Sequence, residues 1–201
     1  MKRPALAVLA AAGGIVMAGS FAPVAAQDTG TFTLTQNGNQ IATESFTRTA
    51  DRLETQLDVT GQGIMASTST LGADATVSRV ELRVLPPGDP DADPLQSTAA
   101  DFAGDSVHFE QPIGTEMGSV AASEGTVPYL NPSPSYMEQI VRRARAMGGS
   151  EVTVQIWIPG PGGGQVVPAQ VAFADAGTTL TLGQATVEIE TDDEGRLLSA
   201  E

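Results

Sequence analysis

Apolar and polar residues alternate along most of this chain, and this two-residue period limits its possible folds more than any other feature. The segments 53–59, 80–84 and 152–158 carry the clearest alternation, and 107–109 repeats it. Successive side chains of a strand point to opposite faces, so these segments predict β-strands with one buried and one wet face. The chain is therefore predicted to be mainly β.

Turn residues join further strands. Asn37-Gly38-Asn39 lies between alternating segments and predicts a β-hairpin over about residues 32–46. The segment 86–94 holds four prolines and three aspartates and must be a loop, because proline donates no ladder hydrogen bond. Pro168, inside an expected strand over 165–174, favours an edge position or a bulge.

One segment has a helical period instead. Met137, Ile140, Val141, Ala144 and Met147 recur at spacings of three and four, which predicts a helix over about 135–147. The sequence S-x-x-E from residue 135 predicts a capping box, and the glycine at 148 a C-terminal stop.

Together these segments predict roughly nine strands and one helix. The expected fold is a single curved antiparallel sheet or partly open barrel, with the helix at about 135–147 packed on it. No Gly/Ser-rich linker is present, so residues 27–201 are expected to form one β-rich domain. Residues 112–132 receive no assignment. The short last segment, 196–200, suggests that the sequence stops inside a strand and that a few native residues follow Glu201.

The first 26 residues have the form of a secretory signal peptide. Lys2 and Arg3 precede an apolar run, and small residues lead to a predicted cleavage between Ala26 and Gln27. Glycines interrupt this run, which is too short for a membrane anchor, and no later segment is apolar for long enough to cross a bilayer. We expect an exported bacterial protein, periplasmic or extracellular.

Charge and missing residue types exclude several function classes. Residues 27–201 carry eight arginines, no lysine and all 24 acidic residues, for a net charge of −16. This surface repels nucleic acids and anionic membranes. No cysteine is present, so disulfides and thiolate metal sites are excluded, and one histidine leaves little room for catalytic triads.

Three motifs invite chemical interpretations. Ser106 and His108 resemble part of the serine block of GDS-type esterases, but a distant histidine base is missing, so both are expected on a solvent face. Asp89, Asp91 and Asp93 have the spacing that opens a calcium loop, yet a proline replaces the required glycine, which favours a solvated acidic loop with at most weak calcium binding. The glycine-rich segment 160–164 lacks the lysine and helix of a phosphate loop and is predicted to be a hairpin loop. No catalytic, cofactor or metal site is predicted, and the chain is not expected to be an enzyme.

Four residues are candidates for ligand contact. Arg142, Arg143 and Arg145 could bind a carboxylate or other anion at the mouth of the sheet, whereas an exposed helix face that complements the helix dipole is the favoured interpretation. Trp157 could line an apolar cavity or cover the sheet beneath the helix; the second role is more usual for a lone tryptophan.

The start of the mature segment, TFTLTQNGNQIATESF, resembles the start of exported bacterial antiparallel-sheet proteins, namely half-barrel carriers of the LolA/LppX type and related uncharacterised families. The resemblance covers about sixteen residues and the general strand rhythm, while the clearest helix lies unusually late. It implies a curved sheet around an apolar groove that holds an acyl chain.

These observations support three hypotheses. The leading one is a non-enzymatic exported protein that binds a hydrophobic or amphipathic ligand, such as a lipid, or a lipidated partner in a curved sheet. The alternative is a structural or interaction module of the cell envelope that binds a protein partner through sheet edges or its acidic surface. The third, hydrolysis by paired carboxylates, requires a buried acidic pair in a cleft.

Overall fold

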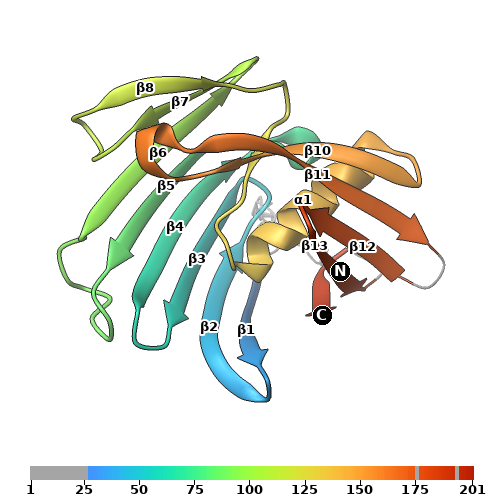
Figure 1. The fold of residues 1–201 in the computed structure, drawn as a ribbon, viewed down its shortest axis with the longest axis horizontal. Coiled ribbons are helices and arrows are strands. Elements are labelled where there is room, and N and C mark those ends of the chain that lie inside the picture. Colours follow the sequence, from blue (N-terminus) through green and yellow to red (C-terminus); the bar gives the residue numbers. More distant parts are fainter. Residues whose placement is uncertain (1–26, 175–176, 193–194) are drawn as a thin grey trace, which may run out of the picture.

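The structure is a computed structural model that describes residues 27–174, 177–192 and 195–201. It contains two β-sheets and one α-helix, α1 (Pro134–Met147), which lies between them (Figure 1). A mainly β fold with a curved antiparallel sheet and one packed helix is therefore confirmed. The strands are divided over two sheets, however, rather than forming a single one.

The first sheet has eight strands in chain order, each antiparallel to the next. They are β1 (Asp28–Gln36), β2 (Asn39–Arg48), β3 (Arg52–Val59), β4 (Gly63–Leu71), β5 (Val77–Leu85), β6 (Gln96–Ala103), β7 (Ser106–Glu110) and β8 (Met117–Ala121). The predicted hairpin corresponds to β1 and β2, and the proline-rich loop joins β5 to β6. Short connections make this meander possible, because antiparallel neighbours need only a tight turn.

The second sheet has six strands in the order β14-β13-β12-β11-β10-β9. They are β9 (Val127–Pro128), β10 (Glu151–Ile158), β11 (Gln165–Ala174), β12 (Gly177–Leu182), β13 (Ala185–Thr191) and β14 (Leu197–Ala200). Only β9 and β10 are parallel among the described pairs, and α1 lies in the connection between them. The unassigned segment 112–132 thus supplies β8 and β9, whose short lengths leave little periodic signal.

The prediction for Pro168 is correct only locally. Its strand β11 lies between β10 and β12, so it is not an edge strand. The pairing with β12 begins at Ala169, however, so Pro168 itself faces only one neighbour, opposite Gln155 of β10. The missing N–H is tolerated where no second strand needs it.

The N-cap of the helix lies two residues earlier than predicted. Ser133, not Ser135, is the N-cap: its hydroxyl accepts a hydrogen bond from the Tyr136 backbone N–H at 3.4 Å, and Pro134 occupies the first helical position. The predicted capping box is therefore wrong. Gly148 ends the helix with a φ of 77°, as expected for a C-terminal glycine.

The core joins both sheets through α1. Ile140, Val141 and Ala144 are fully buried, and α1 contacts β9, β10 and β14 with this side. Trp157 of β10 packs edge-on against Phe102 of β6, with ring centroids 5.9 Å apart. These contacts hold the second sheet across one face of the first, here called the helix side (Figure 1).

Candidate functional site

Polar side chains fill the contact between α1 and the helix side of β2–β4. Glu44 of β2 is buried under the helix N-terminus, where its carboxylate accepts hydrogen bonds from the Ser133 hydroxyl at 2.5 Å and the Ser135 backbone N–H at 3.0 Å. Tyr136 is also buried, and its hydroxyl is bonded to Ser67 and Ser69 of β4. We call this hydrogen-bonded contact the seam.

A buried ion pair continues the seam. Arg48 lies at the end of β2, and its Nη1 donates to Gln139 at 2.6 Å while its Nε lies 3.3 Å from Glu138. Glu138 is 1% exposed and also binds Arg142 at 2.8 Å and the backbone N–H of Leu197 at 2.8 Å. This one carboxylate therefore links the first sheet, the helix and the last strand.

The seam is structural rather than catalytic in its geometry. Glu44 and Glu138 form the buried acidic pair that hydrolysis by paired carboxylates requires, but neither lines either of the two hollows described below. A reactant needs access to the carboxylates, and both residues are at most 1% exposed. The pair therefore fixes the position of α1 on the sheet.

Burial raises the pKa of Glu44 above its ordinary value of 4.5, although the bonds from Ser133 and Ser135 oppose this shift. Between 4.5 and the raised value, the native state holds more protons than the unfolded state. The contribution of Glu44 to stability is thus present at low pH and lost as the pH rises through this window.

We expect a comparison of the wild type with Glu44→Gln to reveal the pH range over which the stability contribution of Glu44 is lost. The free energy of unfolding of the wild type, relative to the variant, should fall as the pH rises from 4.5 through the raised pKa of Glu44. Urea denaturation at several pH values measures it. A difference that stays constant or increases with pH would contradict the raised pKa.

Beyond the seam, apolar side chains remain partly open on the helix side. Cross-strand pairing places Phe32 and Leu34 of β1, Val59 of β3, Met65 of β4 and Val84 of β5 on this side, and all five are half-buried. Phe32 stacks on Phe46 of β2 with centroids 5.2 Å apart. We call these five residues the open apolar face.

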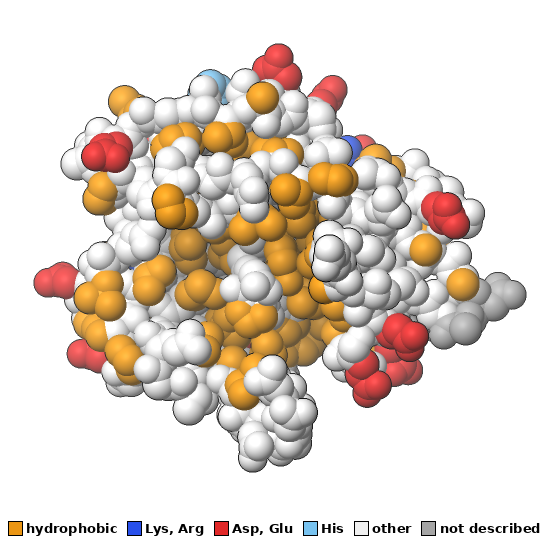
Figure 2. Space-filling view, in the orientation of Figure 1, with side chains coloured by type: hydrophobic (Ala, Val, Ile, Leu, Met, Phe, Trp, Pro, Cys, Tyr) orange, Lys and Arg blue, Asp and Glu red, His pale blue; other side chains and the backbone are white. Residues whose placement is uncertain are grey.

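Figure 2 shows hydrophobic side chains in a continuous, hollowed stretch through the middle of this view, between the two sheets. The acidic side chains in the same view lie at the periphery of the molecule. An apolar hollow bordered by polar surface is typical of a binding site for an apolar group.

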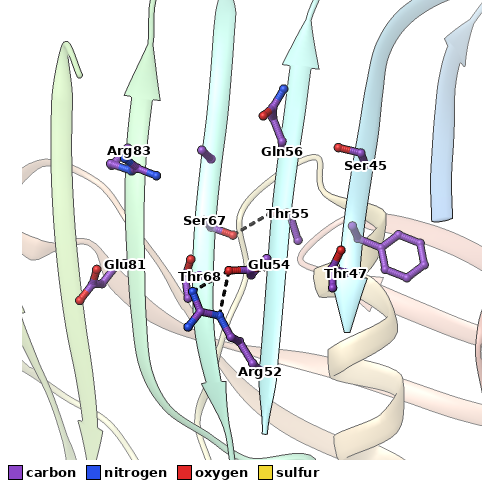
Figure 3. A pocket seen from close by; sticks show the side chains of 12 residues that line it. Ser45, Thr47, Arg52, Glu54, Thr55, Gln56, Ser67, Thr68, Glu81 and Arg83 are labelled. Atoms are coloured by element: carbon purple, nitrogen blue, oxygen red, sulfur yellow. Dashed lines mark hydrogen bonds and ion pairs between the residues drawn. The ribbon is translucent and has the colours of Figure 1, made fainter. Parts of the chain in front are cut away.

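The opposite, outer face of the first sheet has a polar hollow of about 570 Å³, here called the outer trough (Figure 3). Ser45, Gln56, Ala66 and Arg83 lie in one row across β2–β5, and Thr47, Glu54, Thr68 and Glu81 in the next. The short side chains Ala66 and Thr68 of β4 lie between longer ones on β3 and β5, and this difference in length creates the hollow.

A second hollow of about 220 Å³ lies where the two sheets are connected. It is lined by β5, the β6–β7 turn and residues 123–126. Ser106 borders it and donates to Asp105. His108 is exposed on the opposite face from buried Val107, as predicted.

The three helix arginines do not converge on a common site. Arg142 binds Glu138, Arg143 donates to the Asp74 carbonyl at 3.1 Å, and Arg145 donates to Thr191 at 2.6 Å. Arg145 also lies over the ring of Phe173. Arg142 thus pairs within the helix, whereas Arg143 and Arg145 fasten the helix to two different segments. The role of all three in ligand contact remains a prediction.

Trp157 is 1% exposed and lines neither the outer trough nor the hollow of about 220 Å³. Its indole N–H donates to the Gly163 carbonyl at 2.8 Å, which holds the glycine-rich loop against the sheet. Gly163 has a φ of 91°, and a Cβ there would overlap the ring of Phe109. The loop therefore needs glycine for close packing, not for phosphate binding.

Two further predictions concern the ends and loops. Ala26 and the rest of the predicted signal segment lie outside the described residues, while Gln27 is exposed. In the acidic loop, Asp89 accepts a hydrogen bond from the Asp91 backbone N–H at 3.2 Å. The described residues contain no group of three or more potential ligands placed to hold a metal ion. Within the same residues, no helix has the length and apolarity needed to cross a bilayer.

Sequence reasoning missed the seam, although a signal was present. Glu44 and Arg48 occupy the same alternate positions of β2 as Ala42 and Phe46, so charged residues fall on the apolar side of a strand. Charges are rarely buried unless they are paired or hydrogen-bonded. This pattern indicates a buried polar contact on that face.

The fold defines a class of mainly β proteins in which an eight-stranded meander and a smaller sheet enclose one helix. No family model and no curated protein matches the chain. A similar fold is present in the crystal structure of a DUF1089 family protein from Pseudomonas aeruginosa, with a TM-score of 0.62. The similarity covers 85% of this chain and 95% of the other at 12% sequence identity, so it concerns the fold alone.

Proposed function

We propose that this protein is exported and binds a hydrophobic or amphipathic ligand, or a lipidated partner, on the open apolar face. One observation carries the proposal: half-buried apolar side chains of β1, β3, β4 and β5 lie on the helix side of the first sheet beside the seam. Figure 2 shows an apolar, hollowed stretch between the two sheets. Burial of this surface is favourable by about 25 cal/mol per Å², so an acyl chain would gain affinity there without any charged contact.

The seam supports this proposal because it keeps α1 from closing over the open apolar face. Its directional hydrogen bonds to Glu44 and to Ser67 and Ser69 fix where the helix lies on the sheet. A helix held only by apolar contacts could move across the neighbouring apolar strands and fill the hollow. Export is supported by the signal segment at 1–26.

The test is mass spectrometry of protein purified from a bacterial periplasm, under native and denaturing conditions, with organic extraction of any released compound. We expect a native mass excess that extracts as lipid. Met65→Glu should abolish this excess because it places a charge on the open apolar face. Thr70→Glu is the matched control, since Thr70 lies exposed on the outer face of the same strand.

A bare polypeptide mass for the wild type would contradict ligand binding. Equal loss in both variants would indicate a general effect on the fold, which thermal unfolding of each variant would reveal.

The alternative function, binding of a protein partner through a sheet edge, is favoured by one feature. Met117 is 79% exposed on β8, an edge strand of the first sheet. Edge strands have unpaired backbone groups that can pair with another chain. Crosslinking in envelope extracts tests this function, and a chain that forms no crosslinked complex would count against it.

A further inference from the structure

Arg83 differs from every other arginine in the described residues. The other seven each have a hydrogen bond, an ion pair or a ring contact, whereas Arg83 has none. In residues 27–201 acidic residues outnumber arginines three to one, yet the exposed Arg83 has no acidic partner among the described residues. Arg83 lies at the outer trough, the hollow of about 570 Å³.

Two polar neighbours of Arg83 also have side chains without hydrogen bonds to described residues. Ala66 lies directly beside Arg83 in the register, Gln56 lies beyond Ala66, and Ser45 completes the row. Neither Gln56 nor Ser45 makes a side-chain hydrogen bond to any described residue, and Figure 3 shows the row across the strands. The guanidinium, the amide and the hydroxyl are all hydrogen-bond donors.

The spacing of this row leaves room for an anion. Arg83 and Gln56 lie two strands apart, about 9.6 Å between backbones, and the methyl group of Ala66 occupies little of the space between them. A carboxylate or phosphate above Ala66 would accept from the guanidinium on one side and the amide on the other. The planar guanidinium group of arginine favours such bidentate hydrogen bonds.

The next row has the opposite hydrogen-bonding character. Glu54 and Glu81 lie on either side of Thr68, and both carboxylates are about half exposed at the trough. They can accept hydrogen bonds from an ammonium or a hydroxyl group. The residues that line the trough include two arginines, Arg52 and Arg83, and these two glutamates, so the trough lacks the strong negative charge of the whole chain.

We infer that the outer trough binds a small polar molecule that carries an oxyanion, with Arg83 as the anchoring residue and hydrogen-bond donors on the ligand facing Glu54 and Glu81. This site lies on the opposite side of the sheet from the open apolar face. It goes beyond the proposed function and does not depend on it.

The test is calorimetric titration of the full mature chain at about 0.1 M salt, which screens distant charges. The probes are acetate, inorganic phosphate and the zwitterionic dipeptide glycylglycine. Acetate and phosphate distinguish a carboxylate from a phosphate ligand. Glycylglycine should bind more tightly than acetate, because its ammonium group can donate hydrogen bonds to Glu54 and Glu81.

Arg83→Gln should weaken binding at least about tenfold, in line with the loss of one charge-assisted bond. Arg196→Gln removes the same charge outside the trough and should change affinity less than about twofold. Arg83→Lys should restore part of the affinity by charge alone. Equal effects of Arg83→Gln and Arg196→Gln, or no binding of any probe at about 10 mM, would overturn the inference.

Discussion

Glu138→Gln is expected to destabilise the fold by about 3–5 kcal/mol, because it leaves the buried guanidinium of Arg48 without its counter-charge. Arg48 lies on the first sheet and Glu138 on α1, so the loss acts on the contact between the two halves. Chemical denaturation of the wild type and variant measures the difference in the free energy of unfolding.

Two controls separate charge from packing. In the double variant Arg48→Met/Glu138→Leu, apolar side chains replace both charges, and part of the lost stability should return. The Leu197 backbone N–H still loses its acceptor, so recovery is incomplete. Glu54→Gln removes one partner of the exposed Arg52–Glu54 pair and should cost less than about 1 kcal/mol. A Glu138→Gln effect as small as the Glu54→Gln effect would show that the buried pair does not hold the seam.

Trp157→Ala is expected to cost about 3–5 kcal/mol, since it removes the largest buried side chain from the contact between the sheets. Its ring packs on Phe102 of the first sheet, and its N–H holds the loop at Gly163. Thermal unfolding followed by circular dichroism is the measurement, because the variant lacks the only tryptophan.

Trp157→Phe separates the two contributions. It keeps an aromatic ring but loses the hydrogen bond to Gly163, so a smaller cost of about 0.5–1.5 kcal/mol is expected from the lost bond. Any cavity that the smaller ring leaves would add to this cost. Met117→Ala, at an exposed position, should change stability by less than about 0.5 kcal/mol. If Trp157→Ala were as mild as Met117→Ala, the contact with Phe102 would not join the sheets.

The local period was sufficient to predict most individual elements. Alternation located β3, β5 and β10, and the spacing of Ile140, Val141 and Ala144 located α1 and its buried side. These features depend on neighbours in the sequence, so the sequence alone determines them. The turn at residues 37–39 joins β1 to β2 for the same reason.

Features that depend on distant contacts could not be predicted in this way. Ser133 and Ser135 are both good caps, and the proline between them favours Ser133, a signal that the capping-box pattern outweighed. The division into two sheets depends on how β8 and β9 leave the meander, which no periodicity records. The open apolar face and the seam lie on the same side of the first sheet, and only the position of α1 distinguishes them.

The strand order of the first sheet also bears on how the chain assembles. Each of its eight strands pairs with the strand next in sequence, so loop closure is inexpensive at every step and the sheet can grow from its N-terminal end. The bond between Arg48 and Gln139, in contrast, joins residues 91 positions apart. The meander can therefore precede the docking of α1, and the rate-limiting event should be the closure of this long-range contact rather than the pairing of strands.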